Sequence, residues 1–289
     1  MTGLDREFLA DWIECALLVR RGRALGFDAL YGYADEVLEA GAAQVSLAVA
    51  QMTKRAQVLG EAYPFMVHGD VAVRGKANAV DYPYSGLLLL APGGPVRHHL
   101  WASPTEEMVV AFERLTEVSV QHLWGESGRA VRFGWPSEAG RPPSFDEAVP
   151  WLAQKMGIAV GAGYRQPRRK DGGVDVVAWR PFPDGRPGFP IALVQCTLQE
   201  NLVAKASDVD IRLWASWLSM DLEPVIALAT PKTIRQGTVW DELALKGMVL
   251  ERLRLTGLAP VGPMTGATAG WCVQTVERLR GTMRGVEGL

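Results

Sequence analysis

Asp175 is the acidic residue whose surroundings most clearly suggest chemistry. It lies in the otherwise apolar segment Val174–Ala178, and a buried carboxylate is costly unless it is paired or bound to a metal ion. Gln195 and Thr197 are two residues apart in a second apolar segment, so in a strand their side chains point to one face. Oxygen ligands at a sheet edge, with room for a lysine, suit a Mg²⁺-dependent phosphodiesterase, because the metal ion must hold a water nucleophile and polarise the phosphate.

Two short motifs surround these residues. Residues 171–175 read Asp-Gly-Gly-Val-Asp, and residues 194–197 read Val-Gln-Cys-Thr. Together they resemble the Asp-Gly-Gly-Ile-Asp and Val-Gln-Cys-Lys signature of Mrr-like endonucleases, a branch of the PD-(D/E)XK nuclease superfamily. The helix expected from Phe145 to Met156 is similar to the family's first helix. The resemblance extends from about Ser144 to Leu255 and does not include residues 1–140.

The resemblance implies a set of site residues. Asp175 would bind the metal ion, and Gln195 would stand in the second acid's place as a neutral oxygen ligand. The backbone carbonyl of Cys196 would be a further ligand. Glu147 would lie where a first-helix glutamate completes the site in some family members. The resemblance therefore implies Mg²⁺, or Mn²⁺, as the cofactor.

Thr197 departs from the family pattern, which has its catalytic lysine at this position. A threonine cannot supply the positive charge that stabilises a pentacovalent phosphate. Lys205, just ahead of the next expected helix, is the replacement that we favour, because some superfamily members carry this lysine outside the strand. We therefore expect a catalytic set of Asp175, Gln195, Lys205 and Glu147.

Each of these residues also has a purely structural interpretation. Glu147 has the spacing of the glutamate in a capping box that opens a helix at Ser144. Gln195 could hydrogen-bond across the sheet, Lys205 could be a solvated residue at a helix start, and Cys196 could be a small buried hydrophobe. The two interpretations differ in whether Lys205 reaches the face of the sheet that holds the metal ligands.

A basic run, Arg168-Arg169-Lys170, directly precedes the expected metal-binding strand. Its position favours contact with nucleic-acid phosphates, and a solvated loop is the alternative. The formal net charge of -2 and the pI near 6.1 count against a free-standing nucleic-acid binder, because non-specific DNA affinity comes largely from lysine and arginine. A local basic cluster, or a partner that contacts the DNA, is compatible with this charge.

The elements that must position these residues follow from the spacing of apolar side chains. Residues 1–140 are expected to form a mainly helical domain with a few strands. Helical spacing runs from about Leu4 to Leu59 and again over Thr105–Leu123. Strands are expected at the short apolar runs 65–67, 71–73 and 87–90. Glycine, proline and arginine accumulate between Gly125 and Pro143, which predicts a domain boundary.

In residues 141–289 helices and strands alternate, which predicts an α/β (α+β) unit with a mixed central sheet flanked by helices. A capping box opens a helix over 144–156, in which Pro150 predicts a kink or a later start. The other expected elements are strands at 174–179, 191–197 and 225–229 and helices at 208–218 and 240–255. This order fits the restriction-endonuclease-like core that the resemblance implies.

The composition, with 48% hydrophobic and 21% charged residues, is that of an ordinary soluble globular protein. The three cysteines form no CxxC pair, which fits reduced thiols in a cytoplasmic protein and excludes a cysteine zinc site. No N-terminal stretch has the pattern of a secretory signal. The longest apolar run, 86–91, is far shorter than the roughly 20 residues of a membrane helix.

The expected function is that of a metal-dependent endodeoxyribonuclease that hydrolyses phosphodiester bonds. The resemblance alone adds a role in bacterial defence against foreign DNA. The alternative is a catalytically inactive nuclease-fold subunit that binds nucleic acid or a protein partner in a defence complex, as Thr197, Gln195 and the acidic pI favour. DNA is preferred to RNA as the partner. A homodimer would serve double-strand cleavage, because one such site cuts one strand.

Overall fold

The computed structural model describes residues 5–20, 24–69, 72–101, 103–137, 140–163, 167 and 171–283. The chain forms two units. The first contains the residues up to Ala111, Pro231–Thr233 and the segment from Val261, and the second contains Phe112–Thr230 and Ile234–Pro260. The boundary predicted near residue 140 therefore lies elsewhere. Its glycine- and proline-rich stretch belongs to the second unit, where the amides of Phe133 and Gly134 donate to the carbonyl of Asp175.

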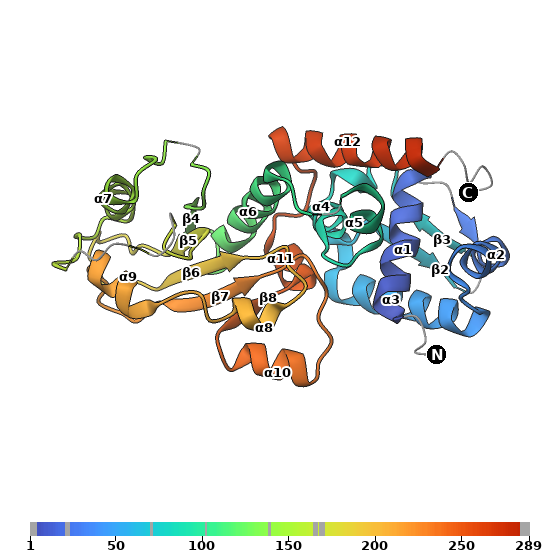
Figure 1. Ribbon diagram of the computed structural model, residues 1–289, viewed down its shortest axis with the longest axis horizontal. Helices are drawn as coiled ribbons and strands as arrows, with labels where there is room; N and C mark the ends of the chain where they lie inside the picture. The colour runs from blue at the N-terminus through green and yellow to red at the C-terminus, as the bar shows by residue number, and fades with distance from the viewer. Residues whose placement is uncertain are drawn as a thin grey trace. The chain divides into compact units, whose positions relative to one another are not determined.

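The first unit combines helices with a three-stranded antiparallel sheet of order β1-β3-β2 (Figure 1). Its strands are β1 (Leu25–Gly26), β2 (Phe65–His68) and β3 (Ala72–Gly75). Its helices are α1 (Arg6–Val19), α2 (Phe27–Leu38), α3 (Ala42–Leu59), η1 (Gly60–Ala62), η2 (Ala79–Asp81), α4 (Pro83–Leu90), α5 (Pro95–Leu100) and α12 (Gly266–Met283). The strands predicted near 65 and 73 are present as β2 and β3, and they pair with Val67 opposite Val73.

The strand predicted at 87–90 is wrong, because these residues form the second half of helix α4. Each residue from Tyr84 to Leu90 is buried, so the run is apolar on every side of the helix. A short apolar run of this kind cannot be assigned to strand or helix from periodicity alone. Pro83 at the first turn, where a missing N–H costs nothing, is the local signal for a helix start.

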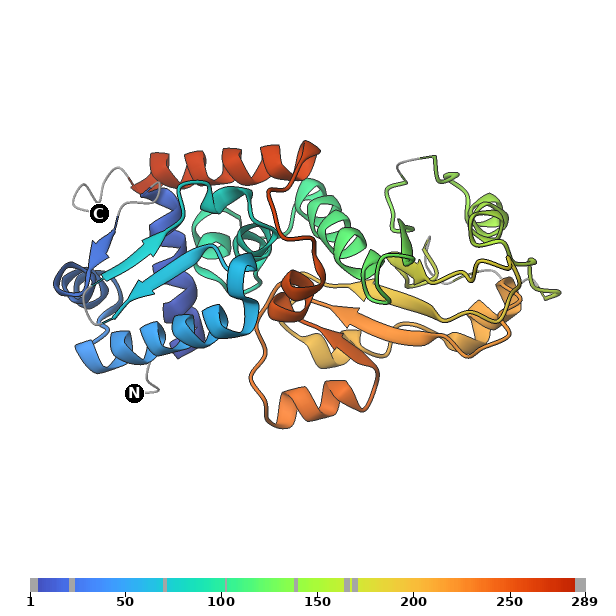
Figure 2. The same cartoon turned by 180° about the vertical axis from the view of Figure 1, so that it is seen from behind.

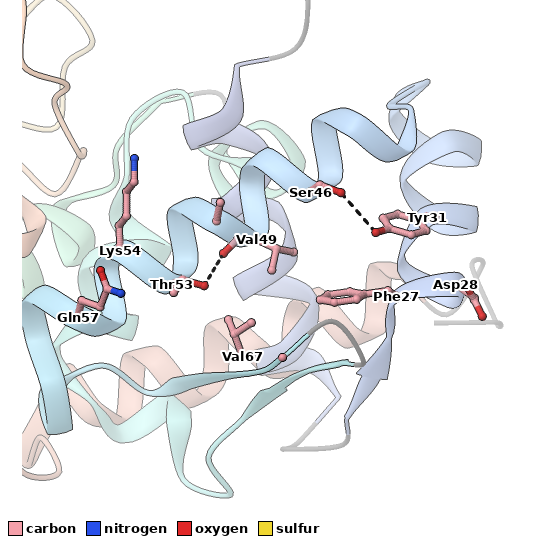
Figure 3. Close-up of a pocket in the computed structure, with 11 residues that line it drawn as sticks. Phe27, Asp28, Tyr31, Ser46, Val49, Thr53, Lys54, Gln57 and Val67 are labelled. Atoms are coloured by element: carbon pink, nitrogen blue, oxygen red, sulfur yellow. Dashed lines mark hydrogen bonds between the residues drawn. The ribbon is translucent and has the colours of Figure 1, made fainter.

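A hollow of about 700 Å³ in the first unit is lined by residues of α2, α3 and β2 (Figure 3). Phe27 and Tyr31 stack with ring centroids 6.1 Å apart, and the Tyr31 hydroxyl lies 3.4 Å from Ser46 Oγ. Val67 approaches the hollow from the sheet (Figure 3). The residues that line it include none of the predicted catalytic set.

The second unit is built on a five-stranded mixed sheet of order β4-β5-β6-β7-β8 (Figures 1 and 2). Strands β4 to β6 are antiparallel, and β6, β7 and β8 are parallel. The strands are β4 (Arg129–Arg132), β5 (Val176–Trp179), β6 (Ile191–Cys196), β7 (Val225–Ala229) and β8 (Met248–Leu250). The helices are α6 (Glu106–Gln121), which begins in the first unit, α7 (Phe145–Met156), α8 (Leu202–Lys205), α9 (Ile211–Trp217), α10 (Thr238–Ala244) and α11 (Arg252–Leu258). The predicted α/β class with a mixed sheet is thus present.

Two apolar clusters hold helices against this sheet. The larger one joins α7 and α9 to strands β4, β5 and β6, with Phe145, Trp214 and Trp217 packed edge to face. The smaller one joins α8 and α10 to β7 and β8 through Leu202, Leu228, Leu243 and Val249. Burial of side chains of this size contributes about 1.5–3 kcal/mol each, so the clusters fix the strands that carry the candidate site.

The helix predicted at 240–255 is wrong in its middle, where α10 ends and β8 and α11 follow. Gly247 marks the break: a Cβ there would lie 2.6 Å from the carbonyl oxygen of Ile226. The chain therefore approaches β7 too closely for any side chain at this position. Strand β4 was also missed, because its residues fall in the stretch assigned to the domain boundary.

The other predicted elements differ from the structure at their ends. The strand predicted from residue 174 begins at Val176, and the strand predicted to end at residue 197 ends at Cys196. The helix predicted from Asp208 begins at Ile211. Pro150 lies within α7, so the predicted later start is wrong. None of the described helices combines the length and the apolar character that crossing a membrane requires.

Candidate functional site

Asp175 lies at the bend directly before β5, and several backbone contacts hold it there. Its amide donates to the carbonyl of Val194 at 2.9 Å, and its own carbonyl accepts from the amides of Phe133 and Gly134 at 2.7 and 2.9 Å. Its carboxylate oxygen Oδ2 accepts from the amide of Cys196, the last residue of β6, at 2.7 Å. The carboxylate is therefore tied to the end of β6, as the pairing of the two motifs required.

Gln195 is buried in β6, on the same face as Leu193, which belongs to the cluster beneath α7 and α9. Its Nε2 donates to Oδ2 of Asp208 at 3.0 Å. Thr197 is buried just after the strand, and its hydroxyl oxygen accepts from the amide of Gln199 at 3.2 Å. The threonine at the family's lysine position thus takes part in the turn that leaves β6.

Lys205 is the last residue of α8 and reaches the same carboxylate oxygen as Gln195. Its Nζ lies 3.1 Å from Oδ2 of Asp208, and both side chains are about four-fifths buried, with exposed fractions of 22% and 20%. Its positive charge also acts on Asp175, whose pKa it lowers. The lysine therefore belongs to the group around Gln195 and Asp175 and does not point away into solvent.

Glu113 of α6 is an acid of this site that sequence reasoning missed. It is buried, and the Nε of Arg132 in β4 donates to its Oε2 at 2.6 Å. Gly134 faces it, and a Cβ at that position would overlap the Glu113 carboxylate. One sequence signal could have revealed it. Glu113 lies on the inward-facing side of the helix, with Val109, Thr116 and Val120, where an acidic residue is unusual.

Glu147 is not among the residues that the described contacts bring to this site. It is exposed in α7, and its amide donates to the hydroxyl oxygen of Ser144 at 3.3 Å, in the manner of a helix N-cap. The acid that α6 places beside Asp175 is Glu113. The predicted phosphate-contacting run, Arg168-Arg169-Lys170, lies outside the described residues.

Burial dominates the electrostatics of the two acids. Loss of water raises the pKa of Asp175 to about 7, with Asp171 adding to the rise, while the Cys196 amide, Arg132 and Lys205 oppose it. Loss of water likewise raises the pKa of Glu113 to about 8, with Asp175 adding to the rise and Arg132 opposing it. Asp175 thus disfavours the ionisation of Glu113, and Asp171 disfavours that of Asp175. A nearby divalent cation would remove these costs.

The donor chemistry fits a hard cation that prefers oxygen ligands, such as Mg²⁺. Among the described residues, no three histidine, cysteine, aspartate or glutamate side chains gather in a metal-binding group. The candidate donors are instead mixed: the carboxylate of Asp175, the amide oxygen of Gln195 and the carbonyl of Cys196. Glu113 and Asp171 add negative charge around Asp175.

Comparisons of this chain with protein-family models, with curated proteins and with solved structures give no match. The assignment of the site therefore rests on the residues themselves and on their geometry.

The metal-free protein is expected to lose stability as the pH rises from about 4.5 to 8. The native state keeps protons on Glu113, with a pKa of about 8, and on Asp175, with a pKa of about 7. The unfolded chain releases these protons near pH 4, so the native state binds more protons across this interval and the free energy of unfolding falls. Thermal unfolding in EDTA at pH 6 and pH 8.5 measures this effect.

In that experiment Glu113→Gln should show a smaller fall in Tm between the two pH values than the wild type. The exposed Glu223→Gln serves as the matched control and should behave as the wild type does. Equal pH slopes in all three proteins would contradict the placement of Glu113 in a buried acidic pair.

Proposed function

We propose that the second unit is a metal-dependent endodeoxyribonuclease with a restriction-endonuclease-like core. One observation carries the proposal: Asp175, Gln195 and Lys205 gather where β6 ends. Asp175 bonds to the Cys196 amide, and Lys205 shares a carboxylate oxygen with Gln195. The order of a helix, an antiparallel three-strand meander and two further parallel strands also supports a core of the PD-(D/E)XK type.

In this proposal the carboxylate of Asp175, the amide oxygen of Gln195 and the carbonyl of Cys196 would hold Mg²⁺ or Mn²⁺. When bound, the metal ion would polarise the phosphate and make a water molecule acidic enough to act as the nucleophile. Glu113 would take the part first assigned to Glu147, because α6 is the helix that brings an acid to Asp175. The buried Arg132 would hold the Glu113 side chain in place through its 2.6 Å bond.

Lys205 would stabilise the charge that builds up on the phosphate in the transition state. An ammonium group has three N–H donors, so it can bond to Asp208 and to a phosphate oxygen at the same time. From the end of α8, Lys205 would take the role of the lysine that the family motif has at position 197, where this chain has a threonine. The migrated lysine is thus part of the proposal, together with a role in bacterial defence against foreign DNA, which the motif resemblance supports.

A second candidate function is that of a catalytically inactive nuclease-fold subunit that binds nucleic acid or a protein partner in a defence complex. The observation that favours it is the pairing already present in the site. Arg132 already bonds to Glu113, and Lys205 already pairs with Asp208, without any metal ion. Because these polar groups already have partners within the protein, the site can keep its structure without binding a metal ion or catalysing a reaction. RNA as the substrate and assembly as a homodimer are further variants of the proposal.

Cleavage of supercoiled plasmid by the purified full chain tests the proposal. We expect nicking that requires Mg²⁺ or Mn²⁺ and stops in EDTA. Lys205→Ala should reduce the rate by about 10²–10³-fold, the effect of removing one group that stabilises transition-state charge. Lys155→Ala, an exposed lysine of α7, is the control and should cleave as the wild type does.

Absence of cleavage with either metal, combined with retained binding of the DNA in a gel-shift assay, would favour the inactive subunit. Cleavage that Lys205→Ala leaves unchanged would remove the migrated lysine from the proposal.

A further inference from the structure

Asp208 is joined to both Gln195 and Lys205 through one oxygen atom. Oδ2 accepts from Nε2 of Gln195 at 3.0 Å and from Nζ of Lys205 at 3.1 Å. We propose that Asp208 is a positioning residue that supplies the negative charge absent from Gln195 and fixes the orientation of the Gln195 amide and of Lys205. Its catalytic consequence rests on the proposed function, whereas its structural consequence does not.

The orientation of the Gln195 amide follows from the hydrogen-bond donors that its contact with Asp208 requires. An ionised carboxylate only accepts hydrogen bonds, so Gln195 must present its NH₂ group to Asp208. The amide oxygen Oε1 then points away from Asp208, and no described residue donates a hydrogen bond to it. A flipped amide would place two acceptor oxygens 3.0 Å apart. Asp208 therefore selects the one orientation in which Oε1 is available as a ligand.

The charges of these three residues form one set. A glutamine together with a neighbouring aspartate carries the same single negative charge as one carboxylate at the Gln195 position would. The negative charge lies in the loop before α9 and not in the strand, and the ammonium of Lys205 lies against it. The lysine and the acid are thus held together beside Gln195 by one contact.

Asp208 is not needed for the start of α9, because Asp210 is the N-cap of that helix. The Asp210 carboxylate accepts from the amides of Arg212 and Leu213 at 2.9 and 3.3 Å. The Asp208 side chain, two residues earlier, turns instead toward β6 and is about four-fifths buried. Of the two aspartates close to the start of α9, only Asp210 therefore caps the helix.

The glycine turn of the first motif explains how the Asp208 backbone comes so close. Gly173 has a φ of +81°, and a Cβ at this position would lie 3.0 Å from the carbonyl oxygen of Asp208. Asp171 holds the turn by accepting from the Gly173 amide at 2.8 Å. The glycine thus allows the loop that carries Asp208 to pack against the segment that carries Asp175.

An exchange of side chains between positions 195 and 208 tests this inference. Gln195→Glu alone places two carboxylates against each other, and Asp208→Asn alone removes the charge that faces Lys205. Each single variant is expected to lower the Tm of the metal-free protein. The double variant Gln195→Glu/Asp208→Asn restores one carboxylate, one amide and their hydrogen bond, so its Tm should return most of the way to that of the wild type.

The second measurement is the affinity for Mn²⁺, determined by isothermal titration calorimetry in the absence of DNA. Asp208→Asn should weaken Mn²⁺ binding by roughly 10-fold or more, the usual effect of removing a partner that orients a ligand, and the double variant should recover the affinity. Asp210→Asn is the matched control, because asparagine also caps helices and the Asp210 carboxylate accepts from the amides of Arg212 and Leu213. It should change neither the Tm nor the Mn²⁺ affinity appreciably.

Failure of this inference can be distinguished from failure of the proposed function. A double variant that is no more stable than the worse single variant, and binds Mn²⁺ no better, overturns the role of Asp208 even if the wild type cleaves DNA. Recovery of Tm in the double variant supports the pairing even if the wild type neither binds Mn²⁺ nor cleaves DNA. In that case the nuclease proposal fails and Asp208 keeps its structural role.

Discussion

Asp175→Ala is expected to abolish metal-dependent cleavage, with a loss of about 10³-fold or more in rate, because it removes the central carboxylate ligand proposed for the metal ion. The substitution also leaves the amide of Cys196 without its acceptor at 2.7 Å. Asp175→Asn separates the two effects, since its amide oxygen can still accept from Cys196 while the charge is lost. Both variants should be inactive in the plasmid assay, and the asparagine variant should fold normally.

The pKa of about 7 for Asp175 adds a check on this result. Asp175→Asn removes an acid whose ionisation burial disfavours and keeps the acceptor for the Cys196 amide, so it should raise the Tm of the metal-free protein at pH 8. Inactivity of this variant therefore cannot be attributed to unfolding. Asp184→Ala, in an exposed loop of the second unit, is the control and should retain full activity. Cleavage that persists in both Asp175 variants would place the activity outside this site or in a contaminant.

The residues of the candidate site that sequence reasoning found are close along the chain. Asp175 and Gln195 lie at the junction of two consecutive strands that pair antiparallel, and Lys205 follows within one short helix. Local pairing of this kind is accessible from motif spacing, because neighbouring strands usually pair. Glu113 comes from a helix assigned to the other domain, so no local pattern joined it to Asp175.

Asp208 was missed for a different reason. It is the first residue of the helix expected at 208–218, where an aspartate commonly serves as a helix cap, and Asp210 is a second candidate for the same cap. Only the loop geometry shows that Asp210 takes the cap and that Asp208 turns to Gln195. Sequence alone does not determine how a loop closes on a strand, because that depends on packing such as the Gly173 contact.

The class of the second unit followed from alternating helices and strands, but the edges of its sheet did not. Strands β4 and β8 have only 4 and 3 residues, too few for a clear periodic pattern. The first is hidden in a glycine- and proline-rich stretch, and the second lies inside a segment with good helix formers. Tertiary pairing with β5 and β7 overrides both local signals.

The first unit contains a buried ionic cluster that no sequence pattern indicated. Arg55 of α3 is fully buried and binds three carboxylates of α1: Glu7 at 2.6 Å, Asp11 at 2.8 Å and Glu14 at 2.9 Å. Its Nη1 also donates to the hydroxyl oxygen of Tyr84, which in turn donates to Glu14. Burial alone would lower the pKa of Arg55, but Glu14, Tyr84 and Asp11 together raise it well above its ordinary value.

Arg55→Ala is expected to destabilise the protein by about 3–5 kcal/mol, the usual cost of removing one partner of a buried ion pair. A loss of this size lowers the Tm by roughly 10 °C in a chain of this length. Lys54→Ala is the matched control, because Lys54 is the exposed neighbour on the same helix, and its Tm should stay close to that of the wild type. Thermal unfolding followed by circular dichroism measures both, and a Tm within a degree of the wild type for Arg55→Ala would contradict the cluster.

The expected loss comes mainly from the carboxylates that Arg55 leaves behind, and not from the contacts of its side chain. Without the guanidinium, Glu7, Asp11 and Glu14 repel one another in a place where water cannot solvate them. The difference in Tm between Arg55→Ala and the wild type should therefore shrink when the pH is lowered from 8 to 5, because protonation relieves the repulsion in the variant alone. Arg55→Met should show the same pH dependence, since it restores the volume of the side chain but not its charge. A loss that is independent of pH in both variants would instead assign the destabilisation to packing.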